Sequence, residues 1–138
     1  MKALVGLAAS LCLVGLSHAD ASDDPLPQDQ LKAARASIEA QHKAARKACG
    51  PLKGDREEIC LLEAKGKAQV ARARLDASQD PTPESEQAAK EVEADADYAL
   101  AKAKCGASAD KARKACIAKA RSTREAAVRQ AKVEKVQA

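Results

Sequence analysis

Residues 49–60 read Cys-Gly-Pro-Leu-Lys-Gly-Asp-Arg-Glu-Glu-Ile-Cys, and residues 105–116 read Cys-Gly-Ala-Ser-Ala-Asp-Lys-Ala-Arg-Lys-Ala-Cys. Both stretches begin with Cys-Gly and end on a cysteine eleven positions after the first. Long segments rich in Ala, Lys, Arg and Glu lie on either side, and these residue types favour helices. The two stretches therefore predict the turns of two helical hairpins, each closed by a disulfide.

The spacing of the cysteines fits a bond across each turn. If a hairpin folds at Cys-Gly, the first cysteine ends one helix and the second lies early in the next. Such positions face each other within the ~4.4–6.8 Å Cα separation that a disulfide requires. We therefore predict Cys49–Cys60 and Cys105–Cys116, in preference to the two pairings that cross the repeats. Closing each short loop contributes roughly 3 kcal/mol in the chain-entropy model.

The chain contains a gapless internal repeat with an offset of 56 residues. The Cys-Gly pair and the second cysteine of one copy fall on those of the other, and several alanines also align. Because alanine matches arise easily in an alanine-rich chain, the cysteines and glycines carry the argument. The repeat indicates two hairpins formed by duplication.

The first 19 residues have the pattern of a secretory signal peptide. Lys2 is followed by a mostly apolar run over residues 3–16 and by small residues before Asp20. Cleavage after Ala19 is expected, and cleavage after Ala21 is the alternative. Cys12 then leaves with the signal, so four cysteines remain in a mature chain with no transmembrane segment. An even number of cysteines in an exported chain is typical of a disulfide framework in an oxidising compartment, here the periplasm.

The mature chain divides at its proline-containing segments. We expect a flexible leader over residues 20–28, hairpin 1 over residues 29–79, a linker over residues 80–83 and hairpin 2 over residues 84–138. Helices are expected over residues 28–49, 55–78 and 83–105, and from residue 108 or 110 to about residue 136. Gly50 and Gly106 are expected to adopt a positive φ after a helix. Asp55 and Glu58 are expected to form a capping box.

The predicted fold class is all-α, with two duplicated antiparallel hairpins that form either a four-helix bundle or an open pair. One apolar seam is expected on each of the first three helices, and each seam consists mainly of alanine. Burying an alanine methyl gains much less than the ~1.5–3 kcal/mol of a leucine or isoleucine side chain. The core is therefore expected to be thin, and self-association as a homodimer could bury more of the seams. The seams are Leu31, Ala34, Ile38, Ala45, Ala48; Leu61, Ala64, Ala68, Ala71, Leu75; and Ala89, Val92, Ala96, Ala99, Ala103.

Neither catalysis nor a cofactor is predicted. A redox enzyme favours closely spaced thiols such as Cys-x-x-Cys, and neither cysteine pair has that spacing. A zinc site that joins both cysteine pairs is the alternative to two disulfides. His42 aligns with Tyr98 in the repeat, and both are expected to pack beside the hairpins.

Charge is distributed unevenly over hairpin 2. Residues 84–97 contain six acidic residues and one lysine, whereas residues 102–135 contain eleven basic and three acidic residues. In a hairpin, the acidic segment would lie opposite the basic one, and exposed ion pairs contribute only ~0.2–1 kcal/mol each. The sharper alternative is that the last helix binds a polyanion such as lipopolysaccharide or nucleic acid. The candidate contacts are Arg121, Arg124, Arg129, Lys132 and Lys135.

The segment Tyr98-Ala-Leu-Ala-Lys-Ala-Lys-Cys-Gly, followed by Ala115-Cys-Ile-Ala-Lys-Ala120, resembles a group of small secreted proteins of Gram-negative bacteria. These are alanine- and lysine-rich helical proteins with two cysteine pairs at this spacing, and some carry a TolA-like cell-envelope label. The resemblance covers most of the mature chain and implies a periplasmic location without a known activity. The leading functional hypothesis is a non-enzymatic structural or protein-interaction role in the cell envelope, with an unidentified protein partner. Polyanion binding through the last helix is the alternative.

Overall fold

The computed structural model of this protein describes residues 24–138. The predicted signal peptide and residues 20–23 of the leader lie outside this range. Four α-helices follow one another: α1 (Gln28–Cys49), α2 (Asp55–Gln79), α3 (Pro83–Lys104) and α4 (Asp110–Gln137), with a short 3-10 helix, η1 (Cys105–Ala107), before α4. These bounds agree with the sequence expectations to within about two residues, and the predicted all-α fold of two hairpins is confirmed.

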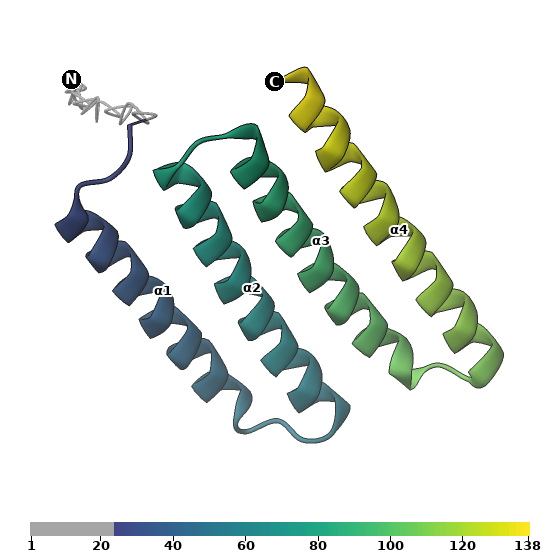
Figure 1. Ribbon diagram of the computed structural model, residues 1–138. Helices are drawn as coiled ribbons and strands as arrows, with labels where there is room; N and C mark the ends of the chain where they lie inside the picture. The colour runs from purple at the N-terminus through teal and green to yellow at the C-terminus, as the bar shows by residue number, and fades with distance from the viewer. Residues whose placement is uncertain (1–23) are drawn as a thin grey trace, which may run out of the picture.

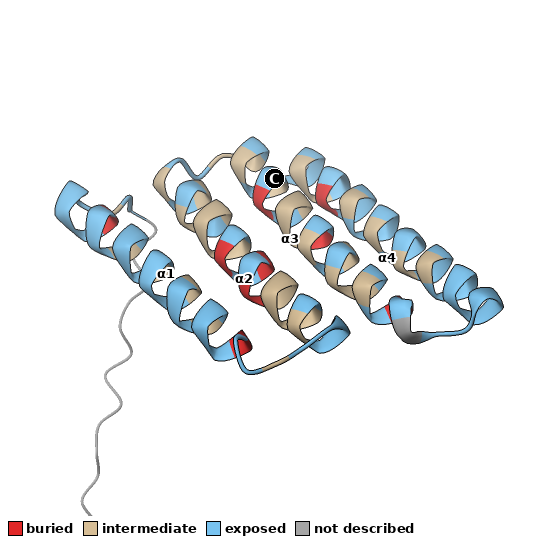
Figure 2. Cartoon of the chain, turned by 90° about the horizontal axis from the view of Figure 1, so that it is seen from below, coloured by how far each residue is buried: buried red, intermediate tan, exposed pale blue. Residues whose placement is uncertain are grey.

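The four helices lie side by side in one open layer (Figures 1 and 2). Each helix packs against its neighbour in the chain, α1 on α2, α2 on α3 and α3 on α4. The hairpins therefore adopt the open arrangement, joined along α2 and α3, and do not close into a bundle. Because the helices alternate in direction, the α1–α2 and α3–α4 turns lie at the same end of the layer. The α2–α3 linker lies at the opposite end (Figure 1).

Both predicted disulfides are present at the turns. The Cα atoms are 5.7 Å apart in Cys49–Cys60 and 5.8 Å apart in Cys105–Cys116. In each pair the first cysteine is almost fully buried, whereas Cys60 is half-buried and Cys116 is exposed. Each disulfide therefore joins the buried end of one helix to the flank of the next.

Two local expectations at the turns are wrong. Gly50 has a φ of −55°, and Gly106 does not adopt a positive φ either. After each cysteine the backbone keeps a right-handed helical conformation, which at Gly106 is the 3-10 helix η1. The positive φ occurs instead at Gly54 (59°), which also occupies the N-cap of α2. With glycine at the N-cap, no side chain caps this helix, so the predicted box of Asp55 and Glu58 does not form.

A capping box does form where it was not predicted, at the start of α3. The Thr82 hydroxyl accepts a hydrogen bond from the backbone N–H of Ser85, and the Ser85 hydroxyl accepts one from the backbone N–H of Thr82. Pro83 occupies the first turn, where its missing N–H costs nothing. Together these residues fix the point at which hairpin 2 begins.

The core is thin, as the alanine content predicts. The buried apolar residues of the described chain are Leu31, Cys49, Ala64, Ala68, Ala89, Ala94, Cys105 and Ala131, and no polar side chain among residues 24–138 is buried. Figure 2 shows the buried positions as small, separate patches on the four helices. The seam predicted for the second helix includes both of its buried alanines, Ala64 and Ala68.

The two central helices, α2 and α3, each pack against a neighbour on two sides. The sequence predicted only one apolar seam on each of these helices. On α2, Gly66 is buried against α3, and a Cβ atom built on it would lie 3.2 Å from the Cβ of Ala96. A glycine inside a helix costs roughly 0.5–1 kcal/mol relative to alanine. The close approach of α2 and α3 accounts for glycine at this position.

Candidate functional site: the cationic disulfide end

The layer has two ends of opposite charge. We call residues 43–66 and 99–122, which flank the two disulfides, the disulfide end; the remaining described residues are the linker end. The disulfide end contains thirteen basic and five acidic residues, a net charge of +8. The linker end contains ten basic and thirteen acidic residues, a net charge of −3. The antiparallel arrangement of the helices therefore concentrates positive charge from both hairpins at one end.

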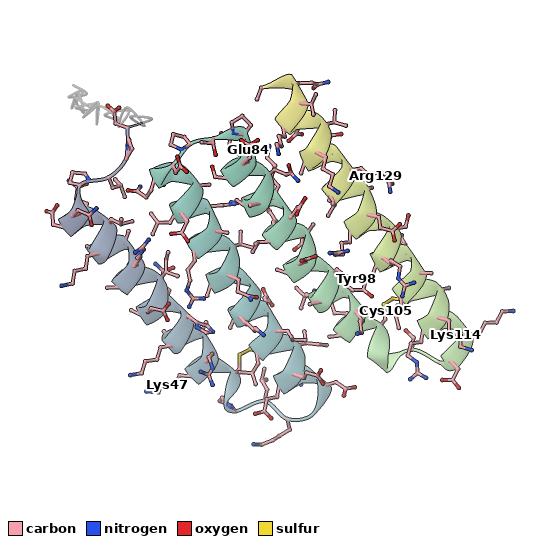
Figure 3. The ribbon with its side chains drawn as sticks, in the orientation of Figure 1. Lys47, Glu84, Tyr98, Cys105, Lys114 and Arg129 are labelled. Carbon is pink, nitrogen blue, oxygen red and sulfur yellow. A yellow bond between two sulfur atoms is a disulfide. The ribbon has the colours of Figure 1, made fainter. Side chains whose placement is uncertain are left out.

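The cations of the disulfide end are exposed, and almost all of them lack an acidic partner within residues 24–138. All thirteen basic side chains belong to exposed residues, and only Arg113 forms an ion pair within residues 24–138, with Asp110 in the same helical turn. Figure 3 labels two of these residues, Lys47 and Lys114, beside the two turns. The other cations without a partner are Lys43, Arg46, Lys53, Arg56, Lys65, Lys102, Lys104, Lys111, Lys119 and Arg121.

Ion pairs between helices are confined to the linker end of the described chain. Six such pairs join neighbouring helices, with N–O distances between 2.6 and 3.1 Å where the contact is of ordinary length. With Lys67, which pairs with Glu63 in the same helix, seven of the ten basic residues at the linker end have a partner. The six pairs are Arg35–Asp76, Arg72–Glu39, Arg74–Glu93, Lys90–Glu134, Arg124–Asp95 and Lys135–Glu84.

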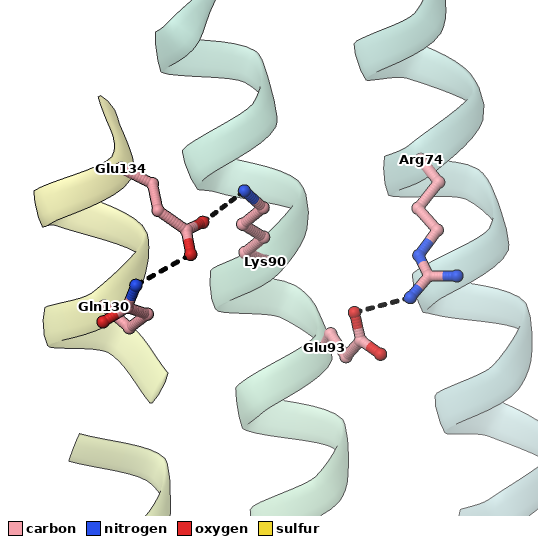
Figure 4. A network of polar contacts seen from close by, with 5 residues as sticks. All are labelled: Arg74, Lys90, Glu93, Gln130 and Glu134. Carbon is pink, nitrogen blue, oxygen red and sulfur yellow. Dashed lines mark hydrogen bonds and ion pairs between the residues drawn. The ribbon is translucent and has the colours of Figure 1, made fainter. Parts of the chain in front are cut away.

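One group of these contacts connects three helices (Figure 4). The Arg74 guanidinium donates to Glu93 across the α2–α3 seam, at 2.6 Å. On the other side of α3, the Lys90 ammonium donates to Glu134 of α4, and the Gln130 amide donates to the second oxygen of the same carboxylate at 2.9 Å. The hydrogen bond from Lys90 lowers the pKa of Glu134, with a smaller contribution from Gln130, and Glu134 in turn raises the pKa of Lys90.

Two more pairs between α3 and α4 shift pKa values in the direction that favours the charged form of each side chain. The hydrogen bond from Lys135 lowers the pKa of the Glu84 carboxyl, and the hydrogen bond to Asp95 raises the pKa of Arg124. The predicted alignment of the acidic part of α3 with the basic part of α4 is therefore present in the structure. All of these side chains are exposed enough for salt to screen them, so they fix the register of the helices more than they add stability.

The structure divides the five residues that the sequence indicated for polyanion binding. Arg121 lies at the disulfide end, and the other four lie at the linker end. Arg124 and Lys135 are engaged by the carboxylates of α3, whereas Arg129 and Lys132 are exposed and make no ion pair within residues 24–138. Figure 3 places Arg129 on α4 well away from the turn. The five residues thus do not form one surface.

Hairpin 1 supplies cations that the sequence argument did not include. Lys43, Lys47, Lys53 and Lys65 come from α1, the first turn and α2, and they lie at the same end as the start of α4. Residues 29–79 contain eleven basic and seven acidic residues, a net charge of +4, but the sequence argument considered only the more uneven distribution of charge along hairpin 2. When two hairpins follow one another in an up-and-down order, both of their turns lie at the same end. This rule could have predicted from the sequence that the cations of the two turns gather at one end.

The remaining candidate residues have structural positions. All four cysteines of the described chain are in disulfides, so none offers a free thiolate to a metal or a substrate. His42 and Tyr98 are half-buried on α1 and α3, in agreement with the expected packing role. Within residues 24–138, no group of three or more His, Cys, Asp or Glu side chains is placed to hold a metal ion. Over the same residues, no helix is long and apolar enough to cross a membrane.

Comparison with known proteins adds no further constraint on the site. No protein-family model matches the chain, and neither a curated protein nor a solved structure matches it. The function of this chain is therefore inferred from its own residues and geometry.

Proposed function

We propose that this chain is a non-enzymatic protein of the periplasm that acts by binding within the cell envelope, with the cationic disulfide end as its binding surface. The ligand chemistry that this surface suits is a polyanion. The observation that carries the proposal is the division of charge. Ion pairs between helices occupy the linker end, while twelve exposed cations at the disulfide end have no partner in the described chain.

The concentration of cations at one end has an energetic cost. The cations of the two neighbouring turns repel one another, and this repulsion destabilises the folded state unless nearby anions or covalent bonds offset it. At the disulfide end the helices are joined covalently, so cross-helix ion pairs are not required there. A polyanion that neutralises the cations releases bound counterions and gains affinity from their release. The exposed lysines and arginines therefore have a use outside the fold.

Two features support a periplasmic location. The expected signal peptide precedes the described residues, the chain forms two disulfides, and disulfides persist mainly in oxidising compartments. Cell fractionation followed by gel analysis of the mature mass tests this part of the proposal. A protein that retains residues 1–19 or remains in the cytoplasm would contradict it.

The test of binding uses two triple variants with the same change in net charge. The first, Lys104→Gln/Lys111→Gln/Lys114→Gln, removes three cations from the disulfide end. The second, Lys32→Gln/Arg129→Gln/Lys132→Gln, removes the three cations of the linker end that make no ion pair in the described chain. Retention on immobilised heparin is measured over a range of salt concentrations for both variants and for the unmodified protein.

We expect salt-sensitive retention of the unmodified protein and weaker retention of the first variant. The slope of log K against log salt should fall by roughly one for each lost contact, and so by about three. The second variant should remain close to the unmodified protein. Equal losses in both variants would mean that net charge alone is responsible, and no salt-sensitive retention of the unmodified protein would refute the proposal.

A further inference from the structure

We propose that the disulfide end docks on an anionic lipid bilayer, with the helices pointing away from the membrane. This inference rests on the proposed function and specifies its partner as phosphate-bearing lipid headgroups in a planar surface. The juxtaposition that leads to it is the placement of two cationic turns at one edge of a flat layer whose opposite edge is acidic.

The cations are close enough to the edge to act on a surface together. An α-helix rises 1.5 Å per residue, so a side chain within about six residues of a turn lies within ~10 Å of the edge, which is about one Debye length at 0.1 M salt. Nine of the twelve cations without a partner satisfy this condition. They are Lys43, Arg46, Lys47, Lys53, Arg56, Lys102, Lys104, Lys111 and Lys114.

The shape of the site favours a plane over a single polymer strand. Proteins that hold a single nucleic-acid strand combine a positively charged groove with aromatic side chains on which bases stack. The only aromatic residue of this chain is Tyr98, a half-buried side chain of α3, and one partly covered ring does not provide a platform on which successive bases can stack. The cations instead come from two separate turns along one edge, an arrangement that several headgroups can meet simultaneously (Figure 1).

The opposite end of the molecule orients the complex. The linker end carries a net charge of −3, and Figure 3 shows Glu84 at that end, remote from Lys47 and Lys114. A negative surface attracts one end and repels the other, so electrostatics alone selects an upright orientation. Each lysine or arginine near an anionic membrane contributes roughly 1 kcal/mol to association.

The first experiment measures co-sedimentation of the full mature chain with vesicles. One set contains phosphatidylcholine alone, and the other contains phosphatidylcholine mixed with phosphatidylglycerol. We expect binding to the mixed vesicles only, and loss of binding as salt is raised. Lys104→Gln/Lys111→Gln/Lys114→Gln should bind about 100-fold more weakly, at about fivefold for each lysine. Lys32→Gln/Arg129→Gln/Lys132→Gln should bind as well as the unmodified protein or better.

A second experiment reports the orientation. The chain has no tryptophan, so one introduced tryptophan is the only such fluorophore. Ser108→Trp places it in the exposed α3–α4 turn, and Ala138→Trp places it at the opposite end of the layer. With mixed vesicles, we expect a blue shift of emission for Ser108→Trp and none for Ala138→Trp.

Each result decides between the two proposals. Retention on heparin without binding to mixed vesicles would overturn the membrane inference and leave the proposed function with a soluble polyanion as ligand. A blue shift for both tryptophan variants would overturn the upright orientation. An absence of binding to both heparin and vesicles would refute the proposed function as well. Circular dichroism of every variant confirms that the helices remain folded.

Discussion

The two ends of this helical layer hold neighbouring helices together by different chemistry. At the linker end, six ion pairs connect the helices, and most basic residues are engaged. At the disulfide end, two covalent bonds connect the helices, and the cations are exposed and without partners in the described chain. The difference teaches that a covalent bond at a helix turn can hold two helices together where no ion pair joins them.

The comparison also concerns energy. An exposed ion pair contributes roughly 0–1 kcal/mol, and salt weakens it. A disulfide that closes a short loop contributes roughly 3 kcal/mol, mainly by restricting the unfolded chain, and salt does not screen that effect. The disulfide end is therefore the end at which unpaired positive charge can be tolerated. Variants that alter one end at a time can break this comparison or make it sharper.

Removal of a disulfide should have the largest effect. We expect Cys49→Ala/Cys60→Ala and Cys105→Ala/Cys116→Ala each to lower the free energy of unfolding by about 3 kcal/mol, measured by urea denaturation. The second variant should lose more at low salt than at high salt, because seven basic residues and one acidic residue surround that turn. Around the first turn, six basic and four acidic residues nearly balance, so the salt dependence should be weaker.

The outcome that would contradict this prediction is equal salt dependence in the two variants. In that case the repulsion among cations would be too weak to matter, and the disulfides would have no special relation to the charge. Peptide mapping under non-reducing conditions provides the control, since each variant should retain the other native disulfide.

The joint between the hairpins, where α2 packs on α3, contains no disulfide and a single ion pair, Arg74–Glu93, and disruption of its packing should have the next largest effect. Gly66 lies so close to α3 that an added Cβ would meet Ala96 at 3.2 Å. We expect Gly66→Leu to destabilise the protein by about 1–3 kcal/mol through overpacking, measured by thermal denaturation. The control is Ala36→Leu on the exposed side of α1, which should change stability little. A stable Gly66→Leu variant would show that α2 and α3 can separate without cost.

Sequence reasoning succeeded where a pattern is local and failed where two helices must be placed relative to each other. The helix bounds follow from alanine propensity and proline breaks, and the disulfides follow from the eleven-residue spacing. The second buried side of α2, marked by Gly66, could not be found, because each helix was given one seam without knowledge of its neighbours. The positive φ was predicted at Gly50 and Gly106 but occurs at Gly54. Several glycines near a turn can adopt a positive φ, and only the backbone geometry determines which one does.

The candidate site was only partly predictable for the same reason. The excess of basic residues in the last helix and their alignment with the acidic part of α3 are visible in the sequence, but which of these basic residues form ion pairs is not. Arg124 and Lys135 turned out to be paired with carboxylates of α3, while Lys47 and Lys53 of hairpin 1 joined the cationic end. Charge summed along a segment does not show which side chains will meet across an antiparallel pair.

A smaller effect of opposite sign is expected at the start of α4. Lys111 lies in the first turn of that helix, where the helix dipole disfavours a positive charge. We expect Lys111→Glu to stabilise the protein by about 0.3–1 kcal/mol and at the same time to weaken retention on heparin. The matched control is Glu84→Lys in the first turn of α3, which should destabilise without weakening retention. A Lys111→Glu variant that is no more stable would argue that this lysine carries no folding cost.

The smallest effect should appear in the dependence of stability on pH, and two of the three carboxyls with a lowered pKa, Glu84 and Glu134, belong to the linker end; the third is Glu63, whose partner Lys67 is in the same helix. The pKa values of Glu84 and Glu134 are lowered in the folded protein by hydrogen bonds from Lys135 and Lys90. As pH falls, the unfolded chain therefore takes up protons at these carboxyls before the folded chain does, and stability is lost as pH drops below about 4.5. We expect Glu84→Gln/Glu134→Gln to show a smaller loss of unfolding free energy between about pH 5 and pH 3, measured by urea titrations.

The control is the disulfide-end variant Glu57→Gln/Glu58→Gln. Its stability should depend on pH as that of the unmodified protein does, because neither carboxylate forms an ion pair in the described chain. If both double variants reduced the pH dependence of stability equally, the ion-paired carboxylates of the linker end would contribute no more than the unpaired carboxylates of the disulfide end. The ion pairs would then not be what fixes the register of the helices.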